Sequence, residues 1–270
     1  MYFINKGDYK MGNDFQQFSL DYFKLDGKVA IVTGGNTGIG QGFAIALAKA
    51  GADLFITTHG NNWGETKELI EKAGRRVAFF QGDLTDKQVS KDIVAKCLET
   101  YGRVDILVNN AGTIRRSPIL EYKDEDWDAV MDINLNAVYF LSQEAAKAMV
   151  EQGSGKIINV ASMLSFQGGK FVPSYTASKH GVAGLTKAFA NELAIKGIQI
   201  NAIAPGYVET KNTAPIREDE VRHAEITSRI PAGRWATPED LQSVVVFLAS
   251  RGSDYMNGAI IPVDGGWLVR

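Results

Sequence analysis

A serine, a tyrosine and a lysine are spaced so that their side chains could act together. Tyr175 follows Ser162 by thirteen residues, and Lys179 follows Tyr175 by four. Residues four apart on a helix share one face, so the phenol and the ammonium would be neighbours. An ammonium favours the phenolate, and we expect Lys179 to lower the pKa of Tyr175 toward neutral, where a phenol can donate or accept a proton. A serine hydroxyl aimed at the same point could hold a substrate oxygen. Because Tyr-x-x-x-Lys is also common on ordinary amphipathic helices, the meaning of the pair depends on the elements around it.

Those elements are strands and helices in alternation from residue 28 to the end of the chain. Short β-branched apolar runs predict buried strands at 28–33, 52–58, 77–80, 103–112, 155–162 and 198–210, with a last strand near the C-terminus. Helical patterns fall between them, at 63–73, 86–101 and 175–196 and as one long helix over 124–150. The alternation predicts a single-domain α/β fold, a doubly wound parallel sheet of Rossmann type with helices on both faces. We expect residues 1–24 to be an N-terminal extension and residues 25–270 to form the domain.

Composition and charge argue against several classes of partner. The chain has 270 residues and a formal net charge of −2, so no basic field suggests nucleic acid or a membrane surface. No apolar run has the length of a membrane span, and no signal peptide is visible. Cys97 is the only cysteine, which is typical of a reducing, cytoplasmic location, and the three histidines lack metal-ligand spacing. We therefore expect a cytoplasmic protein without a metal, a membrane or a nucleic-acid partner.

A glycine-rich loop joins the first strand to the first helix. Gly34, Gly38 and Gly40 would let this loop tighten and let the backbone approach a pyrophosphate, which the N–H groups at the start of the helix would bind. The strand–loop–helix context favours a dinucleotide site over a plain turn. The other loop residues in contact with the cofactor would be Asn36, Thr37 and Ile39.

The end of the second strand bears on the choice of cofactor. An acidic residue there would bind the ribose 2′-OH of NAD, and an arginine would suit the 2′-phosphate of NADP. This chain has neither and reads Thr57, Thr58, His59, Gly60. The lack of cations favours NAD without excluding NADP, and His59 could contact the ribose or simply form the turn.

Taken together, the motifs resemble those of the short-chain dehydrogenase/reductase family over residues 26–270. The resemblance rests on Gly-x-x-x-Gly-x-Gly at 34–40, Asn-Asn-Ala-Gly at 109–112, the Ser162, Tyr175 and Lys179 set, and Pro-Gly at 205–206, all in the family's order. It implies that Asn134 completes the catalytic set by binding a water that links Lys179 to solvent, and that Tyr175 and Lys179 also contact the cofactor. The further cofactor residues implied are Asp83, Leu84, Asn110, Ala111, Gly112, Pro205, Gly206, Val208 and Thr210. It also implies a homotetramer.

The substrate is expected to be an acid. Arg115 and Arg116 follow the fourth predicted strand, where ligands of open parallel sheets bind, and could hold a carboxylate, although adjacent loop arginines are often only solvated. The loop after Ser162, with Met163 and Gln167, could line the substrate pocket.

A narrower likeness is to the family members that interconvert 3-deoxy-D-glycero-2,5-hexodiulosonate and 2-dehydro-3-deoxy-D-gluconate with NAD(H) in uronate breakdown. It is carried by stretches such as IRR at 114–116 and RIPAGRW at 229–235. A gluconate 5-dehydrogenase or another polyol or ketoacid reductase would share every catalytic motif. A nucleotide-binding sensor or scaffold is the alternative outside enzymes.

Overall fold

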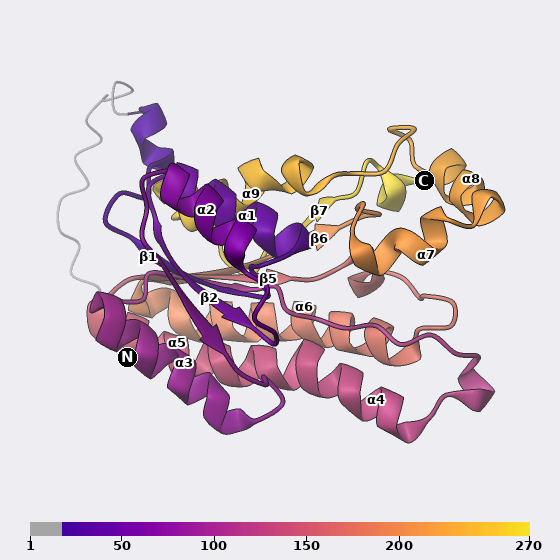
Figure 1. The fold of residues 1–270 in the computed structure, drawn as a ribbon, viewed down its shortest axis with the longest axis horizontal. Helices are drawn as coiled ribbons and strands as arrows, with labels where there is room; N and C mark the ends of the chain where they lie inside the picture. Colours follow the sequence, from indigo (N-terminus) through magenta and orange to yellow (C-terminus); the bar gives the residue numbers. More distant parts are fainter. Residues whose placement is uncertain (1–17) are drawn as a thin grey trace, which may run out of the picture.

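The computed structural model describes residues 18–270, which form one sheet of seven parallel strands in the order β3-β2-β1-β4-β5-β6-β7 (Figure 1). The strands are β1 (Val29–Thr33), β2 (Asp53–Thr58), β3 (Val77–Gln81), β4 (Ile106–Asn109), β5 (Gly155–Val160), β6 (Ile198–Pro205) and β7 (Ile260–Val263). The predicted doubly wound sheet is confirmed. The chain builds outward from β1 to β3 and then returns to place β4 on the other side of β1. The loops that follow β1 and β4 therefore diverge from each other at the carboxyl ends of these strands, which is where such sheets bind ligands.

Helices cover both faces of the sheet. They are α1 (Gly38–Lys49), α2 (Gly64–Lys72), α3 (Lys87–Tyr101), α4 (Asp124–Met131), α5 (Ala137–Gln152), α6 (Pro173–Leu193), α7 (Ala214–Arg217), α8 (Glu220–Arg229) and α9 (Gln242–Ala249). In Figure 1, α1, α2 and α9 lie on one face, and α3 to α6 lie on the other. Each face has its own apolar core: Ala30 and Val32 of β1 belong to the first, and Val29 and Ile31 to the second. This burial on both faces explains why the strands read as continuous apolar runs.

The long helix expected over residues 124–150 is interrupted. α4 ends at Met131, a π-helical turn spans Asp132–Asn136, and α5 starts at Ala137. Asn134 lies in the π turn, fully buried. An interior asparagine weakens a regular helix because its amide can bond elsewhere, and here that amide leaves the helix to bond the loop after β4.

Two predicted strands are shorter than expected. β4 ends at Asn109 rather than at residue 112, because the backbone N–H groups of Asn110 and Ala111 turn to the hydroxyl of Thr33, each at 2.9 Å. β6 ends at Pro205 rather than at residue 210.

Only the last part of the predicted N-terminal extension lies within the described residues. A 3₁₀ turn at Leu20–Phe23 packs near α9, with the guanidinium of Arg251 4.6 Å from the ring centre of Tyr22 and the rings of Phe23 and Phe247 6.4 Å apart. Residues 1–17 lie outside the described residues, and the boundary at residue 25 stays a prediction. Over residues 18–270, none of the helices combines the length and the apolar character needed to cross a bilayer.

Candidate active site

A cleft of about 980 Å³ opens at the carboxyl ends of the strands, next to the divergence of the β1 and β4 loops. Its volume is at the upper end of the range of small-molecule sites. The predicted cofactor residues all line it: Gly34, Asn36, Thr37, Gly38, Ile39, Gly40, His59, Asp83, Leu84, Asn110, Ala111, Gly112, Tyr175, Lys179, Pro205, Gly206, Val208 and Thr210. Segments far apart in the sequence thus share one cavity.

The glycine loop is shaped for close approach of a ligand. Gly34 and Gly38 have φ angles of +62° and +55°, which side chains with a Cβ rarely adopt. A Cβ at Gly40 would collide with the carbonyl oxygen of Gly34 and the side chain of Asn110. Thr37 precedes α1 without capping it through its side chain, so the first N–H groups of α1 remain available for an anion. These features fit a dinucleotide pyrophosphate.

The glycine loop is held from two sides. The Asn36 amide donates to the carbonyl of Asn62 at 2.9 Å, which ties the loop to the segment after β2. The Asn110 amide donates to the carbonyl of Thr33 at 2.9 Å and, at 3.4 Å, to that of Gly34. Asn110 is therefore a structural tie between the two loops as well as a lining residue.

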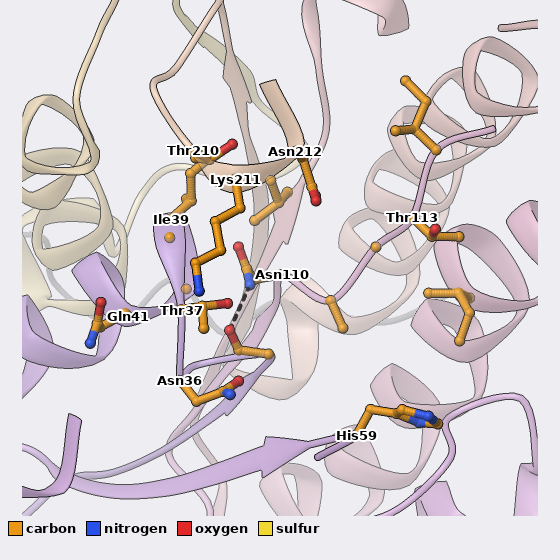
Figure 2. Close-up of a pocket in the computed structure, with 18 of the residues that line it drawn as sticks. Asn36, Thr37, Ile39, Gln41, His59, Asn110, Thr113, Thr210, Lys211 and Asn212 are labelled. Atoms are coloured by element: carbon orange, nitrogen blue, oxygen red, sulfur yellow. Dashed lines mark hydrogen bonds between the residues drawn. The ribbon is translucent and has the colours of Figure 1, made fainter. Parts of the chain in front are cut away.

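Lys211 is a cleft residue that the sequence analysis did not single out. It lines the cavity together with Asn212 and Thr213. Figure 2 shows its side chain extending from the segment after β6 toward Thr37 in the glycine loop. No sequence pattern marks this lysine, because its position depends on how the polar segment after Thr210 folds back over the cleft.

The catalytic candidates meet where β5 ends and α6 begins. Ser162 follows β5 and caps a short turn, its Oγ accepting from the N–H of Leu164 at 3.1 Å. Tyr175 and Lys179 lie one turn apart near the start of α6, and the lysine Nζ is 5.5 Å from the centre of the tyrosine ring. All three line the cleft.

Lys179 is buried, and its ammonium donates to the carbonyl oxygen of Val160 at 2.6 Å. β4 ends at Asn109, opposite Asn159, so β4 offers no strand partner to Val160 and the lysine supplies the missing donor. Desolvation by burial lowers the pKa of Lys179 to about 8.

The expectation that Lys179 lowers the pKa of Tyr175 is wrong for this geometry. Burial raises the pKa of the Tyr175 phenol above its ordinary value. The groups that oppose this rise are the Ser162 hydroxyl, by hydrogen bonding, and then the positive charge of Arg116. Lys179 is not among the groups that shift the pKa of Tyr175, and its ammonium is directed to the carbonyl oxygen of Val160.

Asn134 positions the loop that leads to the arginines. Its Oδ1 accepts from the N–H of Thr113 at 2.8 Å, and its Nδ2 donates to the Thr113 carbonyl at 2.9 Å and the Ser178 hydroxyl at 3.3 Å. These bonds use both amide hydrogens of Asn134 and one of the two acceptor positions of its amide oxygen. The water relay through Asn134 stays a prediction.

The two predicted substrate arginines have different surroundings. Arg115 is engaged, because its Nε lies 3.3 Å from a carboxylate oxygen of Asp126 and its Nη1 donates to the Thr113 hydroxyl at 2.9 Å. Arg116 makes no ion pair within residues 18–270. Desolvation and then repulsion from Arg222 lower the pKa of Arg116, while Tyr175 and Tyr207 raise it, so these groups are its neighbours. Arg116 is thus the better candidate of the two for binding a carboxylate.

Three other predicted contacts have additional or different roles. Met163 is buried in an apolar cluster with Ile226 and Trp235, and neither Met163 nor Gln167 lines the cleft. Asp83 lines the cleft, but its carboxylate accepts from both the N–H and the hydroxyl of Thr85 at 2.9 Å, which holds its pKa below the usual range.

A glycine loop at the β1/β4 switch point beside a Ser-Tyr-Lys set defines a nicotinamide-dependent oxidoreductase of the short-chain dehydrogenase/reductase family, and the chain belongs to this family. The family model described as enoyl-(acyl carrier protein) reductase matches residues 34–268. Like its relatives that are named dehydrogenases, this chain acts on CH–OH groups.

Comparison with individual relatives indicates the kind of substrate. The chain is 55% identical to 2-dehydro-3-deoxy-D-gluconate 5-dehydrogenase of Bacillus subtilis over 93% of this chain and 98% of the relative. A provisionally assigned 2-deoxy-D-gluconate 3-dehydrogenase of Agrobacterium tumefaciens, crystallised with NADP, is 50% identical, with a TM-score of 0.86 over 92% of this chain and 99% of that one. A gluconate 5-dehydrogenase of Burkholderia cenocepacia, in complex with NADP and tartrate, is 35% identical, with a TM-score of 0.90 over 94% of this chain and 100% of that one. The chain is therefore a keto sugar acid oxidoreductase by its relatives. Both crystal neighbours hold NADP rather than the NAD that the sequence favoured.

Proposed function

We propose that the chain reduces the C5 carbonyl of 3-deoxy-D-glycero-2,5-hexodiulosonate to give 2-dehydro-3-deoxy-D-gluconate, and catalyses the reverse oxidation. The observation that carries the proposal is Arg116, a guanidinium without an acidic partner in residues 18–270 whose charge acts on the Tyr175 phenol. A carboxylate on Arg116 would place the far end of a short sugar acid at the tyrosine. The activity named for the relative at 55% identity supports the same substrate.

The chain's own residues would handle the substrate oxygen and its proton. Tyr175 donates its phenolic proton to the C5 oxygen in reduction and takes it back in oxidation. Ser162 holds that oxygen and keeps the pKa of Tyr175 lower than burial alone would. Lys179 fixes the end of β5 through Val160 and lies beside the tyrosine ring. When bound, the nicotinamide supplies or accepts the hydride.

For the cofactor we propose that NADP(H) is accepted as well as NAD(H). Residues 57–62 carry no carboxylate that would repel a 2′-phosphate and no arginine that would select it. The NADP in two crystal neighbours supports the acceptance of the phosphate. We therefore propose that both cofactors are used, in place of the predicted preference for NAD.

Steady-state kinetics with the hexodiulosonate would test the proposal. Reduction should proceed with NADH and with NADPH, and kcat/KM for the hexodiulosonate should exceed that for 5-keto-D-gluconate. Tyr175→Phe should lower kcat by about 10²–10⁴-fold while cofactor binding, followed by fluorescence, is retained. Turnover near the wild-type level in that variant would remove Tyr175 from its role. A higher kcat/KM for 5-keto-D-gluconate would instead assign gluconate 5-dehydrogenase activity.

We further propose a homotetramer. Apolar side chains remain exposed on the outer helical face, among them Trp127 on α4 and Tyr139 on α5, and Leu120 is 96% exposed before α4. Such surfaces are typical of subunit contacts. Light scattering coupled to size exclusion would give the mass in solution, and a monomer at micromolar concentration would refute the tetramer. The cytoplasmic location stays a prediction for cell fractionation to test.

A further inference from the structure

Lys211 is a cation of the cofactor cleft that belongs neither to the Ser162, Tyr175 and Lys179 set nor to the predicted cofactor residues. Its side chain is exposed and lines the cavity. Figure 2 shows this side chain leaving the segment after β6 and extending toward Thr37 in the glycine loop. The ammonium is therefore directed to the part of the cleft that the glycine loop bounds.

The backbone that carries Lys211 is held against the glycine loop. A Cβ at Gly38 would lie 3.5 Å from the methyl group of Thr210, the residue before Lys211. The N–H of Thr210 donates to the Thr213 hydroxyl at 3.0 Å, and this hydroxyl donates to the carbonyl of Val208 at 2.7 Å. Lys211 thus begins a 3₁₀ turn whose start is fixed beside the turn of the glycine loop. The lysine side chain extends from a fixed point of the cleft wall.

The acid nearest to Lys211 in the sequence is already paired with another cation. A carboxylate oxygen of Glu209 lies 3.5 Å from Nη1 of Arg217. Nη2 of the same arginine donates to the carbonyl of Thr210 at 3.2 Å, which closes the segment on itself. Arg217 therefore both braces the backbone before Lys211 and occupies the carboxylate that could have neutralised the lysine.

The acids that line the cleft do not pair with Lys211 either. The carboxylate of Asp83 accepts two hydrogen bonds from Thr85, and that of Glu65 accepts one from the Gln41 amide at 3.2 Å. Within residues 18–270, Lys211 makes no ion pair and its ammonium donates no hydrogen bond. A lysine that lines a cavity without a counter-charge raises the affinity of that cavity for an anion.

The other side of the same space is built for phosphate. The glycine loop leaves the first N–H groups of α1 without a side-chain cap, and the positive end of the helix dipole is directed there. Backbone N–H groups at a helix start and a lysine ammonium are donors that commonly bind one phosphate together. Thr37, which precedes α1, is the residue toward which Lys211 extends.

We propose that Lys211 binds a phosphate group of the dinucleotide from the β6 side of the cleft, across from the N–H groups of the glycine loop. The assignment rests on the nicotinamide cofactor of the proposed function and is independent of which sugar acid is reduced. Two phosphates of the cofactor could supply the anion. The pyrophosphate is common to NADH and NADPH, whereas the 2′-phosphate is present in NADPH alone, so the two cofactors distinguish the sources.

The test is a fluorescence titration of NADH, and separately of NADPH, into the chain without sugar acid at low ionic strength. Lys211→Gln should raise Kd about 5–50-fold, because a charge-assisted contact to phosphate is lost. A loss shared by both cofactors would assign the pyrophosphate, and a loss confined to NADPH would assign the 2′-phosphate. Lys211→Arg keeps a cation of similar reach and should stay within about threefold of the wild type.

Lys196→Gln is the matched control, since it removes the same charge from an exposed position outside the cleft residues. Its Kd values should stay within about twofold of the wild type, because distant surface charges are screened. Added salt should weaken cofactor binding more steeply in the wild type than in Lys211→Gln, which a loss of local structure would not produce. Thermal unfolding without cofactor shows whether each variant remains folded.

Equal Kd values in Lys211→Gln and Lys196→Gln, for NADH and for NADPH, would overturn the role of Lys211 and leave the proposed function in place. A wild type that binds neither cofactor would overturn both. Cofactor binding that depends on Lys211, in a chain that does not turn over the hexodiulosonate, would keep the role of the lysine and discard the proposed substrate.

Discussion

Asn134 and Thr113 are joined by a reciprocal pair of hydrogen bonds, 2.8 Å from the Thr113 N–H to the amide oxygen and 2.9 Å from the amide nitrogen to the Thr113 carbonyl. The pair connects the π turn between α4 and α5 to the loop after β4. That loop continues directly to Arg115 and Arg116, so the asparagine helps to set the position of the two predicted substrate arginines.

Asn134→Ala should therefore lower both stability and substrate affinity. Both backbone groups of Thr113 would lose their partner, and we expect the free energy of unfolding to fall by about 2–4 kcal/mol. KM for the sugar acid should rise more than KM for the cofactor, since Arg116 is displaced. Asn136→Ala is the matched control, because Asn136 is exposed and bonds only to Asp132, so its effect should stay within about 0.5 kcal/mol. Urea unfolding measures both changes, and equal stability losses in the two variants would contradict the role of Asn134.

Lys179 makes the stability of the chain depend on pH in the alkaline range. Its pKa falls from 10.5 to about 8 on folding, so below pH 8 the folded state carries the cost of a buried charge. Between about pH 8 and 10.5 the unfolded state binds more protons at this group, and the free energy of unfolding should rise with pH. The shift corresponds to about 3 kcal/mol over this window.

Comparison with Lys179→Met isolates the effect. Urea unfolding without added cofactor at pH 7, 8, 9 and 10 should show the wild type gaining stability relative to the variant as pH rises. Loss of the bond to Val160 adds an offset that does not change with pH. Parallel pH profiles for the two proteins would show that Lys179 keeps its ordinary pKa.

Ser162 should control the pH range in which Tyr175 works as a base. The hydrogen bond from Ser162 lowers the pKa of the phenol, so Ser162→Ala should raise that pKa further. In alcohol oxidation Tyr175 must be deprotonated, and the rising limb of kcat/KM against pH should move to higher pH. Ser162→Thr keeps the hydroxyl and should restore the wild-type limb. An unmoved limb in Ser162→Ala would mean that the serine only holds the substrate oxygen.

The sheet and the cofactor cleft were predictable because their signals are local. Gly34, Gly38 and Gly40 lie between an apolar strand and a helix, and parallel topology brings every following strand end to the same edge. The same topology brings Pro205 and Gly206, at the end of β6, to the cleft. The prediction of a single long helix over 124–150 was wrong because the apolar pattern continues through a π turn. We attribute that turn to the tertiary hydrogen bond between Asn134 and Thr113, which the local sequence does not show.

The substrate side was less predictable because it depends on charges that meet through packing. The sequence Arg115-Arg116 does not indicate which of the two arginines forms an ion pair with Asp126. Helix α8 lies in a polar segment without strong periodicity, and only the burial of Ile226 against Trp235 shows which stripe of this helix turns inward. The prediction for the pKa of Tyr175 was wrong for a similar reason. The spacing places Lys179 beside the tyrosine ring but does not reveal the bond from the lysine to Val160.

His59 offers a way to test the neutral character of the cofactor's ribose site. It follows the last residue of β2, lines the cleft and is exposed, and Figure 2 shows its ring beside the cavity. His59→Asp would place a carboxylate where NAD-specific enzymes of this fold carry one. Repulsion of the 2′-phosphate should lower kcat/KM for NADPH about 100-fold, while kcat/KM for NADH stays within about threefold. His59→Asn removes the ring without adding charge and should leave the NADPH to NADH ratio within about threefold of the wild type. An unchanged ratio in His59→Asp would place the 2′-phosphate away from the end of β2, and would direct attention to Lys211, whose side chain extends toward Thr37 across the same cleft.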